Sequence, residues 1–272
     1  MNGGPAAVAF TCLVPVWGGD DRDAFVAAMD SLAASTLAPD AIVIAQDGPL
    51  PTPLLADVER AARRFNARHV VNEGPPGLHR NLNRAMAAVE TPYVARFDAD
   101  DLNLPDRFAA QVAFARAHPE VAAFGGAIVE FAPDGRTRRK ATPATHEAIL
   151  RFAAWRNPIN HMTAFFRRDA FFAAGGYPDI PRKEDYGLWL AMLADGARLA
   201  NLTEVLVHAR LGEGLHRRRA GLGNFASEHA LHRLRRAVPG LDPRASALAL
   251  VARSAALAFP GAARLAYWGL RR

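Results

Sequence analysis

The chain has 272 residues, of which 50% are hydrophobic and 22% charged, and this composition excludes an intrinsically disordered protein. The single cysteine, Cys12, excludes an intramolecular disulfide and favours a reducing compartment. No basic N-terminal region precedes a long apolar stretch, and no run of eighteen apolar residues is free of charge, so neither a signal peptide nor a membrane-spanning helix is predicted.

The net charge of +6 is concentrated near the C-terminus. Residues 201–272 contain twelve Arg or Lys residues against four Asp or Glu residues. A basic segment of this kind predicts an anionic partner, such as nucleic acid, a phosphorylated ligand or an acidic membrane surface. Tyr267 and Trp268 beside Arg271 and Arg272 are typical of a membrane interface. The alternative is a helical pair that packs on the preceding domain with its arginines solvated.

Strand-like and helix-like segments alternate through the first half of the chain. This alternation predicts an α/β fold with a mostly parallel sheet covered by helices on both faces. The predicted strands are 8–16, 41–46, 68–72 and 93–97, and the predicted helices are 22–37, 54–66, 78–89 and 105–117, the last with its cap near Asn103 or Leu104. Cys12 lies in the first apolar run and is predicted to be a core residue.

The pattern is looser in the second half. Residues 121–131 are predicted to form a longer strand, and residues 134–140 a polar, mobile loop with a turn at Gly135. Helix-like segments follow at 144–155 and 188–193. Two C-terminal helices are expected at 213–237 and 245–259. We therefore divide the chain into a domain at 1–212 and a basic helical extension at 213–272.

Three carboxylates follow the predicted strand 93–97: Asp98, Asp100 and Asp101. Ligands bind beyond the carboxyl ends of strands in parallel sheets, where Asp47 and Asn72 would also emerge. Hard oxygen ligands select Mg²⁺ or Mn²⁺, and such an ion leaves coordination positions open for substrate phosphates. The alternative for these three residues is a solvated turn and helix cap.

A second acidic pair, Glu184 and Asp185, opens the predicted helix that contains 188–193. Carboxylates in the first turn of a helix satisfy free amides and oppose the positive end of the helix dipole. The functional alternative is a carboxylate base that lies across a pocket from the metal and takes a proton from an attacking hydroxyl.

Several motifs in consistent order resemble those of family 2 glycosyltransferases. They are Phe10 to Trp17, Gln46-Asp47-Gly48-Pro49, Asn72 to Asn81, Arg96 to Arg107, Asn157 to His161, Gly175-Gly176-Tyr177 and Glu184 to Leu190. The resemblance covers residues 8 to about 212. It implies a GT-A fold and an inverting transfer of a sugar from a nucleotide-diphospho sugar to a hydroxyl of a glycan or lipid-linked acceptor, in bacterial surface-polysaccharide synthesis.

The resemblance also implies roles for individual residues. Asp185 would be the catalytic base, with Glu184 beside it, and His161 would be either an acceptor-side contact or a structural histidine. Asp100 would be the main ligand of Mn²⁺ or Mg²⁺, with Asp98 contacting the metal or the ribose. The nucleotide sugar would be bound by Pro15, Asp47 and Arg80.

Two features differ from the commonest pattern of this family. Gln46 replaces an acidic residue before Asp47, which alters one expected nucleotide contact, and a Gln-x-x-Arg-Trp signature of processive synthases is absent, which favours single additions. The other functions considered are a sugar-phosphate nucleotidyltransferase and a non-catalytic protein that binds nucleotide sugars or nucleic acid. No nucleic-acid partner is expected, because no recognisable module interleaves basic and aromatic residues. We expect a cytoplasmic protein with peripheral attachment to the inner face of the membrane.

Overall fold

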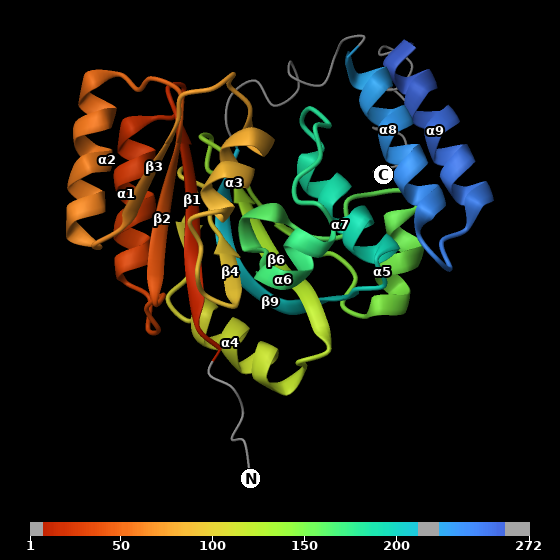
Figure 1. Ribbon diagram of the computed structural model, residues 1–272, viewed down its shortest axis with the longest axis horizontal. Coiled ribbons are helices and arrows are strands. Elements are labelled where there is room, and N and C mark those ends of the chain that lie inside the picture. The colour runs from red at the N-terminus through yellow and green to blue at the C-terminus, as the bar shows by residue number, and fades with distance from the viewer. Residues whose placement is uncertain (1–7, 212–222, 259–272) are drawn as a thin grey trace.

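The computed structural model describes residues 8–211 and 223–258, which form a central mixed sheet with helices on both faces (Figure 1). The strands run in the order β3-β2-β1-β4-β8-β6-β9-β5, and β7 pairs with β6. The strands are β1 Phe10–Trp17, β2 Ala41–Asp47, β3 Arg68–Asn72, β4 Tyr93–Arg96, β5 Leu102–Asn103, β6 Val121–Phe131, β7 Thr137–Lys140, β8 Phe165–Arg167 and β9 Arg198–Arg210. The helices are α1 Arg22–Ala33, α2 Thr52–Arg64, α3 Leu78–Met86, α4 Arg107–Ala117, α5 His146–Ala153, α6 Arg168–Ala173, α7 Glu184–Ala194, α8 Gly223–Ala237 and α9 Pro243–Ala258, with a 3₁₀ turn at His161–Thr163.

The first four long strands form the parallel part of the sheet, as the alternating pattern predicts. Successive side chains of a strand point to opposite faces, so β1 contributes to two cores. Leu13 packs in one core with α3, α5 and α7, whereas Cys12 and Val14 pack in the other with α1, α2 and α4. The prediction that Cys12 is a core residue is confirmed, and burial raises the pKa of its thiol to about 12.

The second half of the sheet mixes directions. Strand β8 lies antiparallel between β4 and β6, whereas β9 runs parallel to β6. The strand predicted at 121–131 is confirmed as β6. Strands β5 and β9 were not among the predicted elements: β5 is only two residues long, and β9 mixes polar and apolar residues.

Two local predictions are wrong. Helix α4 begins at Arg107 after Asp106, because Asn103 pairs with β9 instead of capping the helix. The segment 134–140 is not wholly a loop: Gly135 has a positive φ of 80° in a tight turn, and the chain then returns as β7 alongside β6. A glycine suits this turn because a side chain at that φ is strained.

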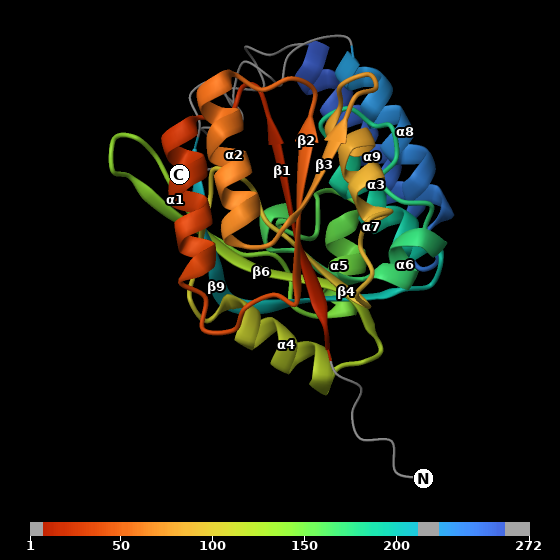
Figure 2. The same cartoon turned by 60° about the vertical axis from the view of Figure 1, so that its left-hand side comes forward.

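The C-terminal helices α8 and α9 lie side by side and pack against the domain next to α7, on the side opposite α1 and α2 (Figures 1 and 2). The helix predicted from residue 213 is described only from Gly223, and Tyr267, Trp268, Arg271 and Arg272 lie outside the described residues. Within 8–211 and 223–258, the helices are too short or too polar to cross a membrane.

Candidate active site

The turn after β4 carries the first acidic cluster. Asp98 forms an ion pair with Arg96, the last residue of β4, whose side chain is buried. The end of β9 holds the turn from the other side: the Arg210 amide donates to Asp101 Oδ1 at 2.8 Å, and its guanidinium Nε donates to the Asp100 carbonyl at 3.2 Å. Two strands far apart in the sequence therefore fix the backbone of this turn.

The positive charge near this turn is too small to balance its three carboxylates. Burial raises the pKa of Asp100, and the neighbouring charge of Asp98 raises it further. Burial and repulsion from Asp98 and Asp100 together raise the pKa of Asp101 to about 8, and its Oδ2 is buried without a hydrogen-bond partner. Asp20, in the loop after β1, responds in the same way, with a pKa raised to about 6 by burial and then by Asp100 and Asp98. A cation would relieve this repulsion.

The ends of β1, β2 and β3 lie beside one another, as the topology predicts. The Asn72 amide donates to Asp47 Oδ1 at 2.8 Å, and the Gly77 amide donates to Asp47 Oδ2 at 2.9 Å. Trp17 is in register with Asp47, and 52% of its surface is exposed. The sequence analysis does not include Trp17 among the candidate site residues. Its position at the end of an apolar strand, where ligands of parallel sheets bind, is the signal in the sequence that could have indicated it.

The other residues predicted to bind the nucleotide lie in different surroundings. Pro15 is buried inside β1, in register with Ala45. Arg80, in the first turn of α3, forms an ion pair with Asp179 at 3.1 Å. Gln46, which replaces an acidic residue, donates to the Gly48 carbonyl at 2.8 Å and so stabilises the turn after β2.

The second acidic cluster lies at the beginning of α7. The side-chain amide of Asn157 donates to Asp185 Oδ2 at 2.5 Å, and the Tyr186 backbone amide donates to Asp185 Oδ1 at 2.7 Å. Burial raises the pKa of Asp185, these two hydrogen bonds lower it, and the charge of Asp98 raises it. Glu184 is buried, and burial together with repulsion from Asp185 raises its pKa to about 7. Asn157 is a contact of the acidic pair that sequence reasoning missed.

The two acidic clusters lie close enough for their charges to interact. The charge of Asp98 acts on Asp100 in its own turn and on Asp185 at the start of α7. Tyr177 is buried near both clusters: burial raises the pKa of its hydroxyl, Arg96 lowers it, and Asp185 and Asp98 raise it. The two acidic segments, about eighty residues apart in the sequence, are therefore within electrostatic range of each other, and a shared pocket between them stays a prediction.

His161 contacts Tyr177 and is held by neighbouring aromatic side chains. Its Nε2 is 3.0 Å from the Tyr177 hydroxyl, and its ring makes an edge contact with buried Trp189. Burial, and then the charge of Arg96, lower the pKa of His161 well below its usual value, so the imidazole is neutral at pH 7. These contacts fit the structural alternative that the sequence left open for this residue.

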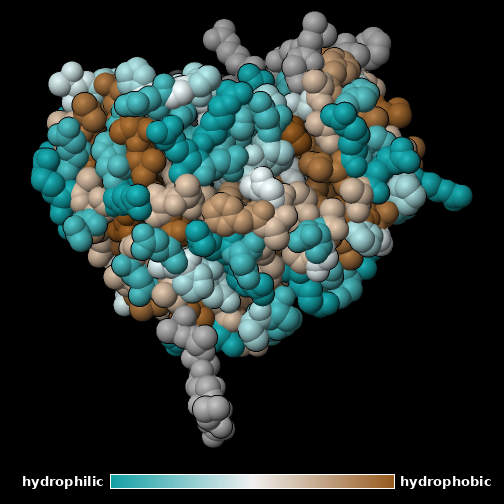
Figure 3. All heavy atoms as spheres, in the orientation of Figure 1, coloured by the Kyte–Doolittle hydropathy of each residue, from teal (hydrophilic) through white to brown (hydrophobic). Residues whose placement is uncertain are grey.

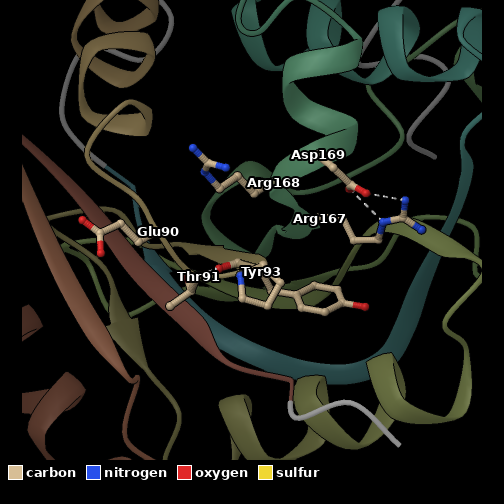
Figure 4. Close-up of a pocket in the computed structure, with 7 residues that line it drawn as sticks. Glu90, Thr91, Tyr93, Arg167, Arg168 and Asp169 are labelled. Atoms are coloured by element: carbon tan, nitrogen blue, oxygen red, sulfur yellow. Dashed lines mark hydrogen bonds and ion pairs between the residues drawn. The ribbon is translucent and has the colours of Figure 1, made fainter. Parts of the chain in front are cut away.

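A separate hollow of about 430 Å³ lies at the other end of β4 (Figure 4). It is lined by Glu90, Thr91, Pro92, Tyr93, Arg167, Arg168 and Asp169. Arg167 and Asp169 form an ion pair there at 2.8 Å, so the two charges compensate each other. None of the residues of the two acidic clusters contributes to this hollow.

Comparison with known proteins identifies the family. The model of glycosyl transferase family 2 matches residues 11–174, and the chain belongs to this family. It is 35% identical to the amylovoran biosynthesis glycosyltransferase AmsE of Erwinia amylovora, over 84% of this chain and 86% of that protein. It is 29% identical to the Escherichia coli UDP-Gal:alpha-D-GlcNAc-diphosphoundecaprenol beta-1,3-galactosyltransferase, over 80% of each chain. The protein is therefore a glycosyltransferase. The family match and these relatives favour this function over that of a nucleotidyltransferase or a non-catalytic binding protein.

Solved structures confirm the GT-A fold. S. aureus TarS 1-349 matches with a TM-score of 0.68 at 16% identity, over 93% of this chain and 72% of that one. The mannosyltransferase PcManGT of Pyrobaculum calidifontis, solved with GDP-Man and Mn²⁺, matches with a TM-score of 0.60 at 20% identity, over 96% and 79% of the two chains. At these identities the likeness concerns the fold.

Proposed function

We propose that this glycosyltransferase transfers one sugar at a time, with inversion, from a nucleotide-diphospho sugar to a hydroxyl of a lipid-linked or glycan acceptor in bacterial surface-polysaccharide synthesis. The observation that carries this proposal is the proximity of the two acidic clusters, in which the charge of Asp98 raises the pKa of both Asp100 and Asp185. One cluster suits the donor diphosphate with its cation, and the other suits the acceptor hydroxyl.

The donor nucleotide would bind at the ends of β1 and β2. Trp17 offers an exposed ring, and base–aromatic stacking is worth about 1–3 kcal/mol per base. Asp47, oriented by Asn72 and Gly77, is placed in register beside it and would accept hydrogen bonds from the base or ribose. Arg80 would approach the diphosphate only after releasing Asp179.

Asp98 and Asp100 would hold Mn²⁺ or Mg²⁺. Their carboxylate chemistry and the raised pKa of Asp100 support this assignment, as does the partnerless buried oxygen of Asp101 in the same turn. In 8–211 and 223–258 no group of three or more His, Cys, Asp or Glu side chains is gathered for a metal, so diphosphate oxygens and water would complete the coordination. When bound, the cation would offset negative charge on the departing diphosphate.

Asp185 would act as the general base. The acceptor hydroxyl would lose its proton to Asp185 as its oxygen attacks the anomeric carbon and the bond to the diphosphate breaks. Asn157 and the Tyr186 amide orient the carboxylate for this transfer. A base is most effective when its pKa lies near the working pH, and burial moves the pKa of Asp185 in that direction. A single displacement needs one base, and Glu184 would support its orientation or contact the acceptor.

A lipid-linked acceptor implies work at a membrane surface. The named activity of the E. coli relative uses a diphosphoundecaprenol-linked acceptor. Helix α9 exposes Leu248 and Val251, at 60% and 66% of their surface, and Figure 3 shows apolar patches among hydrophilic ones on the α8–α9 side of the molecule. We infer peripheral docking through this face. In co-sedimentation with phosphatidylglycerol vesicles, Leu248→Glu with Val251→Glu should reduce the bound fraction, whereas Phe172→Glu on α6 should not; equal binding by all variants would contradict docking through α9.

An assay of nucleoside diphosphate release from a panel of nucleotide sugars is the decisive test of the proposed function. Purified enzyme is incubated with UDP- and GDP-sugars, with and without a polyprenyl-diphosphate-linked acceptor, in Mn²⁺ or in EDTA. We expect release of nucleoside diphosphate that depends on acceptor and metal. In a parallel incubation with nucleoside triphosphates and sugar 1-phosphates, release of pyrophosphate would instead identify a nucleotidyltransferase. Binding of nucleotide sugars without turnover in either incubation would identify a non-catalytic protein.

A further inference from the structure

One buried carboxylate connects the C-terminal helices to the beginning of α7. Glu228, on α8, is only 2% exposed and forms an ion pair with Lys183, the residue before α7. Arg253 of α9 lies 3.3 Å from Glu228 Oε1, and Arg235 of α8 lies 3.7 Å from Oε2. A single negative charge is thus surrounded by three positive ones at the contact between the helical pair and the domain.

Two of these cations, Lys183 and Arg253, connect Glu228 to the beginning of α7 and to the segment before Asn157, the two segments that position Asp185. Lys183 caps α7 and precedes Asp185 by two residues. Arg253 also donates to the backbone carbonyl of Trp155, two residues before Asn157. Asn157 donates a hydrogen bond to the Asp185 carboxylate. The segment that carries the carboxylate contacts Glu228 through Lys183, and the segment that carries the donor contacts it through Arg253.

Arg235 makes a third connection at the same place. Its guanidinium is fully buried, and its Nε donates to the Tyr186 hydroxyl at 3.1 Å. The Tyr186 hydroxyl in turn donates to the carbonyl of Ala153, at the end of α5. The residue next to Asp185 is therefore held between α5 and α8.

Stability alone is a poor explanation for this arrangement. Removing charged groups from water is costly, and buried ion pairs are often no more stabilising than well-packed apolar residues of similar volume. What a buried ionic network provides in favourable cases is a defined geometry. A general base needs such definition, because displacement of a catalytic group by about 1 Å can cost about a hundredfold in rate.

The geometry points to a bracing role for the helical pair α8–α9, with Glu228 as a positioning residue for Asp185. Glu228 acts through Lys183 on the beginning of α7 and through Arg253 on the segment 155–157. It does not contact donor or acceptor itself. This inference rests on the proposed role of Asp185 as base, and it assigns the C-terminal helices a part in the transfer step that is separate from membrane docking.

The test compares the variants Glu228→Gln, Glu228→Asp and Arg253→Gln in the 272-residue chain. Arg236→Gln is the matched control, because Arg236 is exposed on the same helix as Glu228 and loses the same charge as Arg253. Each variant is characterised by kcat, by KM for the donor, by calorimetric affinity for UDP with Mn²⁺ and by Tm.

For Glu228→Gln we expect kcat to fall about 10- to 100-fold, as for a misplaced base, with donor KM and UDP affinity within about twofold of wild type. Glu228→Asp keeps the charge and should recover part of the lost kcat. Arg253→Gln should reduce kcat less, because the ion pair of Glu228 with Lys183 remains, and Arg236→Gln should be unchanged. If Glu228→Gln does not fold, Arg253→Gln carries the test, since the Arg253 side chain is 35% exposed.

Two results would overturn the bracing role: kcat within twofold of wild type in both Glu228→Gln and Arg253→Gln, or a parallel loss of kcat, UDP affinity and Tm, which indicates a purely structural contact. Asp185→Asn is measured in the same assays. If Asp185→Asn remains active, the assignment of the base itself fails. If it is inactive while Glu228→Gln is normal, only the bracing role fails.

Discussion

Replacement of Asp185 by Asn separates catalysis from stability. Asn has nearly the same shape and can still accept the hydrogen bond from the Tyr186 amide, but it cannot take a proton from the acceptor. General bases contribute about 10²–10⁴-fold to rate. At about 1.36 kcal/mol per tenfold change, the barrier to transfer should rise by about 3–5 kcal/mol.

The same substitution should leave the fold equally stable or more stable. Burial raises the pKa of Asp185 above its value in the unfolded chain, so the folded state disfavours the ionised form at neutral pH. Removing the charge relieves that penalty. We therefore expect a Tm equal to or above that of wild type, together with a hundredfold or greater loss of kcat and an unchanged affinity for UDP with Mn²⁺.

Initial rates of UDP release, differential scanning calorimetry and isothermal titration calorimetry measure these three quantities. Asn157→Ala is a useful companion, because it removes the donor at 2.5 Å from Asp185 while the carboxylate itself remains. A rate within tenfold of wild type in Asp185→Asn, or a fall in Tm that accounts for the loss of activity, would refute the reasoning.

Three further predictions concern the rest of the site. Without metal, Tm should fall as the pH rises from about 6.5 to about 8, because the raised pKa values of Glu184 (about 7) and Asp101 (about 8) mean that the folded state binds more protons than the unfolded one, whereas the lowered pKa of His161 opposes this trend only below the ordinary histidine value of 6.5; thermal scans in EDTA across this range would contradict this if Tm rose with pH. Asp100→Ala should abolish the gain in UDP affinity produced by Mn²⁺, and an unchanged calorimetric Kd in Mn²⁺ would count against the metal assignment. Trp17→Ala should weaken UDP binding by about 1–3 kcal/mol, the worth of one stacked base, whereas Trp17→Phe should lose less; equal affinities by fluorescence titration would exclude stacking on this ring.

The pattern of the first half of the chain could be predicted because β1, β2 and β4 are mainly apolar runs buried in the sheet, and its helices are separated from the strands by turn residues. Strand β3, with the sequence RHVVN, is mostly exposed or half-buried and was predicted from its place in the alternation. Helix ends were less predictable. Asn103 has the side chain of a helix cap, yet it pairs with β9 and donates to Ser35, since a distant strand offers it partners that local sequence does not show. The two-residue strand β5 exists only because β9 lies beside it.

The acidic residues of the site were visible in the sequence: Asp47 and Asp98 follow predicted strands, and Glu184 and Asp185 open a predicted helix. The rule that ligands bind at the carboxyl ends of parallel strands predicted the proximity of Asp47, Asn72 and Asp98, whereas the meeting of the second acidic pair with them belonged to the hypothesis of a base opposite the metal. Asn157, Arg210 and Tyr177 could not be assigned in this way. Asn157 and Tyr177 lie in loops and Arg210 ends β9, and none of them has a periodicity that indicates which distant group it contacts.

The sequence by itself determined the fold class, the strand ends that carry Asp47 and Asp98, and the family resemblance, because these depend on local runs and spacings. Only the tertiary structure decided that the charge of Asp98 reaches Asp185, that His161 is held by Tyr177, and that Glu228 is buried among Lys183, Arg235 and Arg253. In the sequence no local pattern indicates that these four charged residues contact one another. Their contact follows from the packing of α8 against α7 and of α9 against α8, which local composition does not encode.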